Sequence, residues 1–297
     1  MKQYLITVDG GTTNTRIMLW DIIHRTIVAQ KKYGIGVRNT AMDGHNAMLK
    51  TAVRDGIADV LLQASLCEAD LQAIVASGML TSNVGLLEIP HIKVPASMTD
   101  LALAMVSADL PDICGLPIHF IPGMKNNCGA VSLANVESMD MMRGEETEIC
   151  AVLDLLESHN PLLLVLPGSH TKFISVDEQG RVTGMLSSIA GELLMSITNH
   201  TVLADAVQHS FVQPDNYERE LVLAGYITAK KVGLGRACFS TRIFNQFVSK
   251  EAARAANFLL GAVLQGDVEA VRNSAALKVS DRTEVIVAGK EPLRTAL

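Results

Sequence analysis

The sequence Asp9-Gly10-Gly11-Thr12-Thr13-Asn14 separates two β-rich runs, Tyr4 to Val8 and Arg16 to Trp20, and a third run follows at Thr26 to Ala29. Runs rich in β-branched and aromatic residues, bounded by Gly and small polar residues, are typical of strands joined by turns. These runs predict an antiparallel meander whose first turn is polar.

The same pattern returns near the middle of the chain. Leu162 to Leu166 leads into the turn Pro167-Gly168-Ser169-His170-Thr171, and further β-rich runs follow at Lys172 to Val176 and Val182 to Met185. More than half the chain separates the starts of the two copies, which indicates two similar domains rather than a short-period solenoid. We place the boundary at Asn160-Pro161 and predict domains 1–160 and 161–297.

The segments between and after these copies alternate helical and strand signals. Helical periodicity is expected from Asn46 to Leu66, and an apolar run at Ile74 to Ala76 opens into the polar loop Ser77 to Gly85. The chain is predicted to be mostly helical from Glu192 onward, until Glu284 to Ala288 gives a last strand. The expected fold class is therefore α/β.

The composition is that of a globular protein. Of the 297 residues, 48% are hydrophobic and 19% are charged, which excludes intrinsic disorder. The net charge of -6 without a basic block argues against a nucleic-acid partner, and no apolar run approaches the roughly 20 residues of a membrane helix. Five cysteines without Cys-x-x-Cys spacing, and no zinc-type histidine spacing, predict reduced thiols, a cytoplasmic protein and no transition-metal site. The oligomeric state is not readable from the sequence.

The first turn has the groups that bind phosphate. They are the backbone N–H groups and polar side chains of Gly10, Gly11, Thr12, Thr13 and Asn14. The neighbouring Asp9 is favourable there if Mg²⁺ lies between its carboxylate and the phosphate, because two anions would otherwise repel. Considered alone, the turn is explained equally well as an ordinary Gly-Gly hairpin. Neither Gly34-x-Gly36 nor Gly233-x-Gly235 completes a dinucleotide-binding motif, and the P-loop signature is absent.

The second turn repeats this chemistry. Gly168, Ser169 and Thr171 offer the same donors, so two such turns are suited to holding successive phosphates of one nucleotide. A turn chosen only for its geometry is a weaker explanation when it is needed twice. Lys172 is also explained as a strand residue that faces water, and His170 as a turn residue, because the sequence shows no acid partner for it.

Two glutamates open a predicted helix, Glu145 to Ser158, whose apolar residues recur at helical spacing. Helical geometry places Glu145 on the face of the apolar stripe and Glu146 toward its edge. A carboxylate at a helix N-terminus suits a general base, although both glutamates are also explained as charges that complement the helix dipole. Arg16 and Arg143 are the expected cations beside anions, with a structural ion pair as the alternative for each.

Three segments resemble motifs of the superfamily that contains sugar kinases, actin and heat-shock chaperone ATPases. Asp9 to Arg16 resembles its first phosphate motif, Pro167 to Lys172 its second, and Val285 to Gly289 the start of its adenosine motif. The resemblance implies two ribonuclease H-like domains, as duplicated βββαβα units, flanking an ATP cleft. It also implies that Asp9 binds Mg²⁺, that Arg16 assists catalysis, and that both turns and Gly289 contact ATP.

The same superfamily suggests the catalytic base. In glycerol and xylulose kinases the catalytic Asp follows a Gly at a helix start, shortly before the second phosphate turn. Gly144-Glu145 occupies that place here, so the resemblance assigns the base to Glu145, with Glu in place of Asp. Glu146 is the alternative.

A closer resemblance, over almost the whole chain, is to the 2-dehydro-3-deoxygalactonokinase family. It is carried by Ser77 to Gly85, Val94 to Ala96, Ile121 to Gly123, Met142 to Thr147 and Leu166 to Lys172. It implies a carbohydrate kinase that uses ATP to phosphorylate the 6-hydroxyl of 2-dehydro-3-deoxy-D-galactonate in D-galactonate catabolism. The sugar-acid residues it implies are Ser77, Thr81, Ser82, Asn83, Arg143 and Glu146.

The chain departs from this family in two places. Gly289 is followed by Lys290 rather than by a second glycine, which changes the expected adenine contacts. Family members continue past the equivalent of Leu297, so we expect the C-terminal domain to be incomplete at its end. Two alternatives stay open: a kinase of this fold that acts on another sugar or sugar acid, and a non-catalytic binding module switched by nucleotide.

Overall fold

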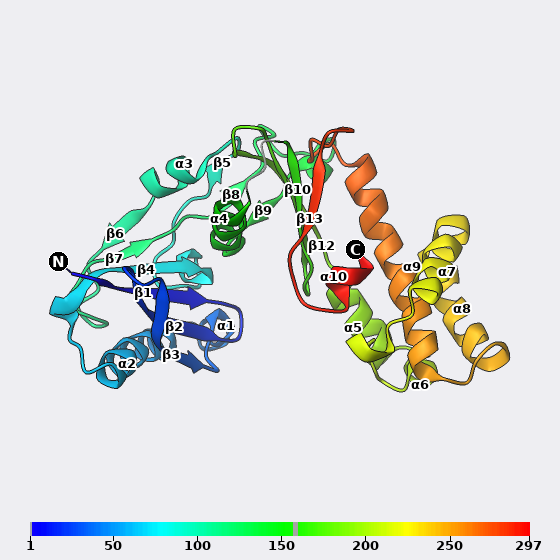
Figure 1. Ribbon diagram of the computed structural model, residues 1–297, viewed down its shortest axis with the longest axis horizontal. Coiled ribbons are helices and arrows are strands. Elements are labelled where there is room, and N and C mark those ends of the chain that lie inside the picture. The colour runs from blue at the N-terminus through cyan, green and yellow to red at the C-terminus, as the bar shows by residue number, and fades with distance from the viewer. Residues whose placement is uncertain (1, 157–159) are drawn as a thin grey trace. The chain divides into compact units, whose positions relative to one another are not determined.

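The computed structural model describes residues 2–156 and 160–297, which form a mixed α/β protein with several sheets (Figure 1). The chain divides into two compact units. Unit 1 comprises Met1–Asn127 and Met141–Ser158, and unit 2 comprises Cys128–Asp140 and His159–Leu297. The segment Cys128–Asp140 therefore groups with unit 2, although it precedes the predicted boundary at Asn160. The assignment of domains 1–160 and 161–297 stays a prediction.

Unit 1 is built on a six-stranded sheet in the order β3-β2-β1-β4-β7-β6. The strands are β1 (Tyr4–Gly10), β2 (Thr15–Asp21), β3 (Thr26–Tyr33), β4 (Leu71–Gly78), β6 (Val106–Ala108) and β7 (Ile118–Phe120). Antiparallel pairing of β1 with β2 and of β2 with β3 confirms the predicted meander. β4 pairs in parallel with β1, so the carboxyl ends of these two strands lie at the same edge of the sheet.

Alternating apolar residues build the core of this unit. Ile6 in β1 and Ile17 in β2 are fully buried, as are Leu49 and Val53 of helix α2 (Ala47–Gln63), which packs against β2 and β3. Full burial of such a side chain stabilises a fold by about 1.5 to 3 kcal/mol. The helix predicted from Asn46 to Leu66 is thus confirmed over Ala47–Gln63, and its apolar face packs on the sheet that carries the first turn.

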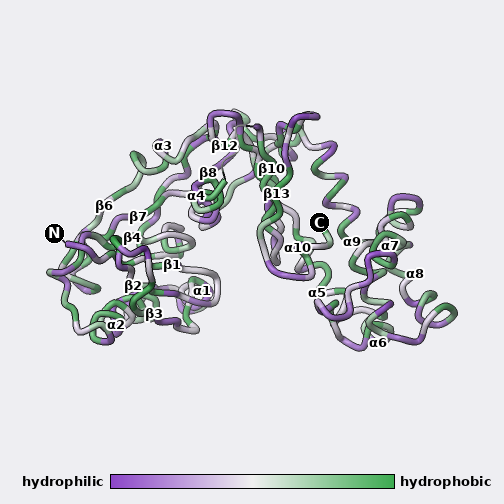
Figure 2. The backbone as a smooth tube through the Cα atoms, viewed as in Figure 1, coloured by the Kyte–Doolittle hydropathy of each residue, from purple (hydrophilic) through white to green (hydrophobic). Residues whose placement is uncertain are grey.

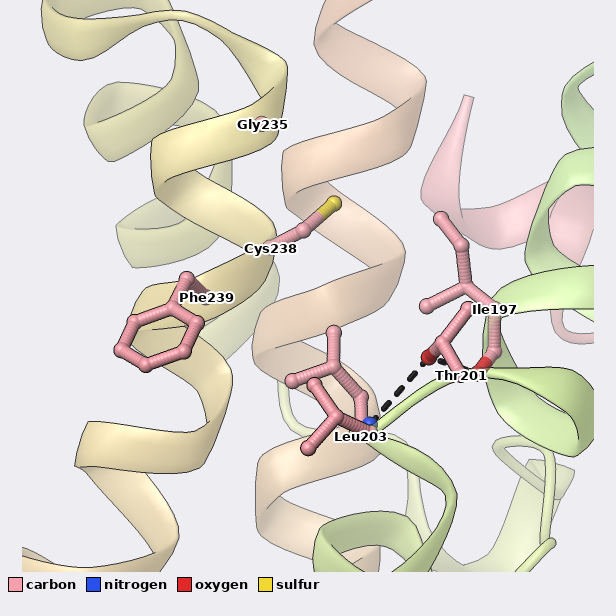
Figure 3. Close-up of a pocket in the computed structure, with 7 residues that line it drawn as sticks. Ile197, Thr201, Leu203, Gly235, Cys238 and Phe239 are labelled. Atoms are coloured by element: carbon pink, nitrogen blue, oxygen red, sulfur yellow. Dashed lines mark hydrogen bonds between the residues drawn. The ribbon is translucent and has the colours of Figure 1, made fainter.

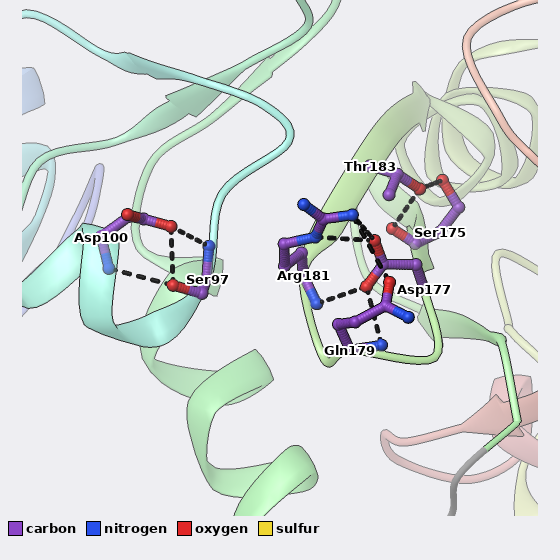
Figure 4. A network of polar contacts seen from close by, with 7 residues as sticks. All are labelled: Ser97, Asp100, Ser175, Asp177, Gln179, Arg181 and Thr183. Atoms are coloured by element: carbon purple, nitrogen blue, oxygen red, sulfur yellow. Dashed lines mark hydrogen bonds and ion pairs between the residues drawn. The ribbon is translucent and has the colours of Figure 1, made fainter.

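A second, three-stranded sheet in unit 1 joins β5 (Ile92–Lys93), β8 (Met124–Lys125) and β9 (Met141–Met142) in that order. It is followed by helix α4 (Glu145–Leu155), which lies beside β8 and β9 in Figure 1. The predicted end of this helix, at residues 157 and 158, lies outside the described residues. The remaining elements of unit 1 are α1 (Val37–Asp43), η1 (Glu68–Asp70), η2 (Met79–Thr81) and α3 (Met98–Leu103). Helix α3 starts at a capping box in which Asp100 N–H donates to Ser97 Oγ at 3.1 Å (Figure 4).

Unit 2 contains a four-stranded sheet in the order β12-β11-β10-β13. Its strands are β10 (Leu162–Leu166), β11 (Thr171–Val176), β12 (Val182–Ser188) and β13 (Glu284–Val287). Three strands are antiparallel neighbours and β13 is parallel to β10, which repeats the arrangement of β3-β2-β1-β4 in unit 1. β10 is buried along its whole length and appears as a hydrophobic segment in Figure 2. The repeat predicted from sequence is therefore present at the level of strand order.

The turn between β11 and β12 is closed by one carboxylate. Asp177 Oδ1 accepts hydrogen bonds from the backbone N–H groups of Gln179 and Arg181 at 3.1 and 2.9 Å, and Oδ2 pairs with the Arg181 guanidinium (Figure 4). These hydrogen bonds outweigh the effect of burial and lower the pKa of Asp177. The second meander is thus fixed by an Asx-type turn.

The rest of unit 2 is mostly helical, as predicted. Its elements are η3 (Val136–Ser138), α5 (Ala190–His200), α6 (Ala204–Val207), η4 (Pro214–Asn216), α7 (Arg219–Val232), α8 (Leu234–Phe247), α9 (Ala252–Asn273) and α10 (Leu293–Ala296). Helix α9 is central and packs against α5, α7 and α8. In the part of the chain that the structure describes, no helix has the length and apolar character needed to cross a bilayer.

Candidate active site

The first turn joins β1 to β2 and projects polar groups into solvent. Gly11 N–H donates to the carbonyl of Asn14 at 2.8 Å, which closes the turn, and Asn14 Nδ2 donates to Thr13 Oγ1 at 2.8 Å. Thr12 and Thr13 are exposed. The hydroxyl groups predicted to contact phosphate are therefore accessible at the tip of the turn.

The start of helix α1 supports this turn from behind. Val37 N–H donates to the Gly11 carbonyl at 3.2 Å, and Arg38 N–H donates to the Thr12 carbonyl at 2.9 Å. A Cβ at Gly36 would lie 2.5 Å from both of these carbonyl oxygens, so a side chain there would displace the turn. In the sequence Gly36 stands out only as part of an incomplete dinucleotide motif, because the close approach of α1 is visible only in three dimensions.

Asp9 and Arg16 stand opposite each other where β1 and β2 meet the turn. Arg16 Nη1 lies 3.1 Å from Asp9 Oδ2, and the two side chains are 55% and 39% exposed. An ion pair this exposed contributes only about 0 to 1 kcal/mol, so either partner is readily drawn to another ligand. The two predicted catalytic side chains are therefore paired, but the ion pair is weak enough for either side chain to bind another ligand.

Close contacts among Gly10, Gly78 and Gly144 bring helix α4 to the same edge of the sheet. Gly78, at the end of β4, has φ +72°, and a Cβ there would lie 2.5 Å from the Gly10 carbonyl oxygen and 3.1 Å from Asp9 Oδ1. Gly144, the N-cap of α4, has φ +117°, and its Cβ would lie 3.3 Å from Gly78 Cα. The absence of side chains at these positions lets the N-terminus of α4 approach Asp9.

The two glutamates at this helix start are buried in the opposite order to that predicted from the helical wheel. Glu146, not Glu145, is buried, at 2% exposure, and its carboxylate accepts N–H groups of Met124 at 3.0 Å and Gly144 at 2.5 Å. Burial raises the pKa of Glu146 despite these hydrogen bonds. The burial prediction was wrong because the Glu146 carboxylate binds the backbone of β8, whereas the wheel was oriented by the apolar stripe further along the helix.

Glu145 is partly exposed and accepts the Arg143 N–H at 3.1 Å through Oε2. One turn further along α4, Glu148 is a carboxylate that the sequence prediction missed. Although Glu148 is exposed as a residue, partial desolvation of its carboxyl group and the negative charges of Glu145 and Asp9 raise its pKa, while Arg16 lowers it. Three carboxylates and one guanidinium thus share one electrostatic neighbourhood. The signal was available, since residues three apart on a helix share a face.

This arrangement suits Mg²⁺ bound mainly through phosphate oxygens and water. Among residues 2–156 and 160–297 no group of three or more His, Cys, Asp or Glu side chains is placed to hold a metal ion. Mg²⁺ in nucleotide sites commonly needs only one or two carboxylates in addition to substrate phosphates. The accessible Asp9 carboxylate beside the first turn fits that requirement.

The loop predicted to bind the sugar acid is held from inside by Arg143. Arg143 Nη1 donates to the Thr81 carbonyl at 2.7 Å and also contacts Thr81 Oγ1, and Nη2 donates to the Ile89 carbonyl at 2.9 Å. Thr81 and Ser82 are buried, and their hydroxyls donate to the carbonyls of Gly78 and Met79. Among the predicted sugar-acid residues, Thr81, Ser82 and Arg143 therefore support the loop.

The other two residues predicted from this loop are more accessible. Asn83 is exposed and Ser77 is partly exposed. Asn83 can donate and accept hydrogen bonds through its amide, which suits hydroxyl and carbonyl groups of a sugar acid. The structure thus separates a supporting group of residues from a group whose side chains can reach solvent.

The second turn, in unit 2, abuts the start of helix α5. A Cβ at Gly191 would lie 2.1 Å from the Gly168 carbonyl oxygen, and Glu192 N–H donates to the Ser169 carbonyl at 3.1 Å. His170 Nε2 lies 3.1 Å from Glu192 Oε1. His170 therefore has an acid partner that the sequence did not reveal, because the two residues meet only when α5 folds against the turn.

Lys172 and Thr171 are buried rather than facing water, which corrects the alternative explanation of Lys172 as a solvated strand residue. Lys172 Nζ donates to Ser187 Oγ at 2.6 Å, and Ser187 Oγ donates to Asp140 Oδ1 at 3.1 Å. Gly289 packs against the same turn, since a Cβ added at Gly289 would lie 3.0 Å from the Pro167 ring. The predicted second phosphate and adenosine motifs are thus adjacent within unit 2.

The family model for 2-keto-3-deoxy-galactonokinase matches residues 9–296. The chain belongs to this family. A probable 2-dehydro-3-deoxygalactonokinase from Rhizobium meliloti (strain 1021) is 28% identical over 205 residues, which cover 69% of this chain and 59% of the relative. The 2-dehydro-3-deoxygalactonokinase of Escherichia coli (strain K12) is 26% identical over 205 residues, with 68% and 59% covered. The match therefore spans less than two thirds of the length of these curated relatives.

The fold of this 2-keto-3-deoxy-galactonokinase family member also matches a solved structure. A crystal structure of a Sinorhizobium meliloti protein named for 2-dehydro-3-deoxygalactonokinase superposes with a TM-score of 0.76 and 23% identity, covering 98% of this chain and 88% of that one. At this identity the likeness concerns the fold. It supports the mixed α/β architecture along nearly the whole chain.

One apolar pocket of this family member has none of the predicted site residues in its lining. It has a volume of about 200 Å³ and lies between the end of α5 and helix α8 (Figure 3). Its lining residues are Ile197, Thr201, Val202, Leu203, Gly235, Cys238 and Phe239. Since no charged side chain lines it, the pocket is unsuited to phosphate or to a carboxylate.

A buried acid in this kinase-family chain gives a prediction about pH. Asp267 of α9 is 3% exposed, and among the described residues its Oδ2 has no hydrogen-bond partner. Burial raises the pKa of Asp267 from 3.8 to about 6, against the opposing effect of a hydrogen bond with Ser188. The native state therefore binds the extra proton between these two values, and the stability of unit 2 should fall as pH rises from about 4 to about 6.

Asp267→Asn removes this titration. Relative to the wild type, we expect the variant to gain up to about 3 kcal/mol of unfolding free energy between pH 4 and pH 8. Hydrogen exchange of α9 peptides, measured at both pH values, reports on unit 2 directly. A difference between the two proteins that does not change with pH would show that Asp267 keeps an ordinary pKa.

Proposed function

We propose that this chain is an ATP-dependent carbohydrate kinase that phosphorylates the 6-hydroxyl of 2-dehydro-3-deoxy-D-galactonate in D-galactonate catabolism, in the cytoplasm. Family membership supports the reaction class. The observation that carries the proposal is the convergence, within unit 1, of the first turn, Asp9, Arg16 and the Glu145 end of α4 through close contacts of Gly10, Gly78 and Gly144. Such a grouping has a phosphate-binding turn, a metal-binding carboxylate and a base.

The proposed fold is a pair of ribonuclease H-like domains. The repeated strand order, with three antiparallel strands and a parallel fourth in each unit, supports it. We propose that ATP takes phosphate donors from both turns, and that the segment at Gly289 contributes to adenosine binding. The phosphate donors are assigned to Gly10, Gly11, Thr12, Thr13, Asn14, Gly168, Ser169, His170, Thr171 and Lys172.

In the proposed reaction the 6-hydroxyl oxygen attacks the γ-phosphorus of ATP. A new P–O bond forms to the sugar acid, the bond from the γ-phosphorus to the β–γ bridging oxygen breaks, and ADP leaves. Glu145 accepts the hydroxyl proton, which is needed only late in a loose transition state. Bound Mg²⁺, held through Asp9, would neutralise phosphate charge. Arg16 beside Asp9 adds positive charge near the γ-phosphate, and the Asn83 amide binds sugar oxygens.

An acceptor panel tests this function. ADP release should depend on added acceptor and should be fastest with 2-dehydro-3-deoxy-D-galactonate among six-carbon sugar acids and their neutral sugars, with the phosphate recovered on O6. Faster turnover of another acceptor would favour a kinase with a different substrate. ATP binding without acceptor-dependent ADP release would favour a nucleotide-switched binding module instead.

A further inference from the structure

One face of the small β5-β8-β9 sheet carries four basic side chains. In this sheet Lys93 pairs with Lys125 in parallel register, and Lys125 pairs with Met141 across β8 and β9. Neighbouring strands lie about 4.8 Å apart and paired residues point to the same side, so the two lysines stand next to each other. Met124 and Met142, which point to the other side, are fully or nearly fully buried. The lysine side is thus the accessible face of this sheet.

His91 and Arg143 continue the same face by one more position along the strands. His91 packs over Gly123, where a Cβ would lie 2.5 Å from the His91 ring, and Arg143 Nη2 lies 3.2 Å from both ring nitrogens. Burial, then Arg143 and then Lys125, lowers the pKa of His91 to about 4, so its ring is neutral at pH 7. We call His91, Lys93, Lys125 and Arg143 the basic face.

The lysines of this face form no ion pair with any residue that the structure describes. Among residues 2–156 and 160–297, neither Lys93 nor Lys125 forms an ion pair or a hydrogen bond through its ammonium group. The negative charges of Glu146 and Glu88 act on Arg143. Two adjacent ammonium groups beside a guanidinium repel one another, and an anion placed between them would remove that cost. The pairing of like charges is therefore explained if the face binds an anion.

The basic face also adjoins the proposed chemistry. Arg143 is followed by Gly144 and then by Glu145, the proposed base, and the Met124 N–H, one residue before Lys125, donates to Glu146 Oε1 at 3.0 Å. A substrate whose hydroxyl meets Glu145 would extend along unit 1 from the start of α4. Arg143 itself is occupied by the carbonyls of Thr81 and Ile89, so the lysines are the donors available for a new contact.

We propose that Lys93 and Lys125 bind the carboxylate of the sugar-acid substrate, with Arg143 and the His91 ring as the positive and polar floor of that subsite. This inference rests on the proposed kinase function, because it assigns one end of the acceptor of that reaction. It makes the two lysines specificity-determining residues, which distinguish a sugar acid from a neutral sugar. Lysine ammonium groups bind carboxylates through charge-assisted hydrogen bonds.

The test compares Lys93→Met and Lys125→Met, singly and together, with Lys125→Arg and with Lys50→Met. Lys50 is a matched control in unit 1 because it is already paired with Asp112 at 2.6 Å. Calorimetry without ATP gives Kd for 2-dehydro-3-deoxy-D-galactonate, with the neutral polyol galactitol as the comparison ligand, and a separate titration gives Kd for ATP. The double variant should weaken acid binding by about tenfold or more, while binding of galactitol and ATP stays within about twofold and Lys125→Arg retains most acid affinity.

The outcomes separate this inference from the proposed function. If the wild type phosphorylates the acid and the lysine variants bind it as tightly as the Lys50→Met control, the subsite is wrong and the kinase function stands. If ATP binding weakens as much as acid binding, the face binds phosphate and the inference is overturned. If the wild type does not turn over the acid, the kinase function fails, and binding without ATP still decides the inference: selective loss in the variants supports it, and absence of acid binding by the wild type refutes it.

Discussion

Replacing Glu145 with glutamine is expected to lower kcat by roughly 10²- to 10⁴-fold, the range typical of a lost general base, while Kd for ATP stays within about twofold. Glutamine keeps the shape of the side chain and an oxygen that can accept the Arg143 N–H, which Glu145 accepts at 3.1 Å. It cannot take the proton of the 6-hydroxyl. Steady-state kinetics with saturating acid, together with ATP binding measured separately, distinguishes loss of chemistry from loss of binding.

Two neighbouring glutamates serve as comparisons for this variant. Glu148→Gln should reduce kcat less than Glu145→Gln does. Glu148 shares the charge environment of Asp9 and Glu145, but it is not the first residue of helix α4. Glu146→Gln should mainly reduce stability, since the buried carboxylate of Glu146 accepts two backbone N–H groups. A Glu145→Gln protein with wild-type kcat would exclude Glu145 as the base, and the largest loss among the other two variants would then identify it.

The parts of the fold that the sequence predicted are those that depend on local patterns. Both meanders, the helix from Ala47 to Gln63 and the last strand at Glu284–Val287 follow from runs of apolar and turn residues that need no distant partner. The position of Asp9 at the end of β1 follows in the same way, because a strand that ends in a Gly-Gly turn fixes where its last side chain stands.

The contacts that decide the roles of individual side chains depend on segments far apart in the sequence. Arg143 holds the Thr81 and Ile89 carbonyls, which no local pattern reveals, and its place beside an anion stays a prediction. The sequence shows no acid partner for His170, yet Glu192 reaches it from α5. Such pairings are set by how helices pack onto the sheets, and a single sequence without its structure carries little information about them.

Gly78→Ala is expected to destabilise unit 1 by roughly 2 to 6 kcal/mol. A non-glycine residue in a backbone region that only glycine normally populates costs about 1 to 3 kcal/mol, and forcing a methyl group into a packed site typically costs another 1 to 3 kcal/mol. Both costs apply here, because Gly78 has φ +72° and ψ -149°, and its Cβ would lie 2.5 Å from the Gly10 carbonyl oxygen. Since the same Cβ would lie 3.1 Å from Asp9 Oδ1, the displaced backbone would also move the proposed metal-binding carboxylate.

Gly44→Ala is the matched control for this substitution. Gly44 lies in the same unit and has φ +74°, but a Cβ there would meet no atom within 4 Å beyond its neighbours in the chain, so only the conformational cost of about 1 to 2 kcal/mol applies. The single tryptophan of the chain, Trp20 in β2, donates to Thr7 Oγ1 at 2.9 Å within unit 1, so its fluorescence during urea unfolding follows unit 1 alone. Gly44 has ψ 5° and lies in the left-handed helical region, whereas Gly78 has ψ -149°, so the difference between the two variants measures the contact with Gly10 together with the glycine-only conformation of Gly78. Equal unfolding free energies would mean that neither feature of Gly78 stabilises unit 1, and the close approach of the three glycines would then not be what holds Glu145 near Asp9.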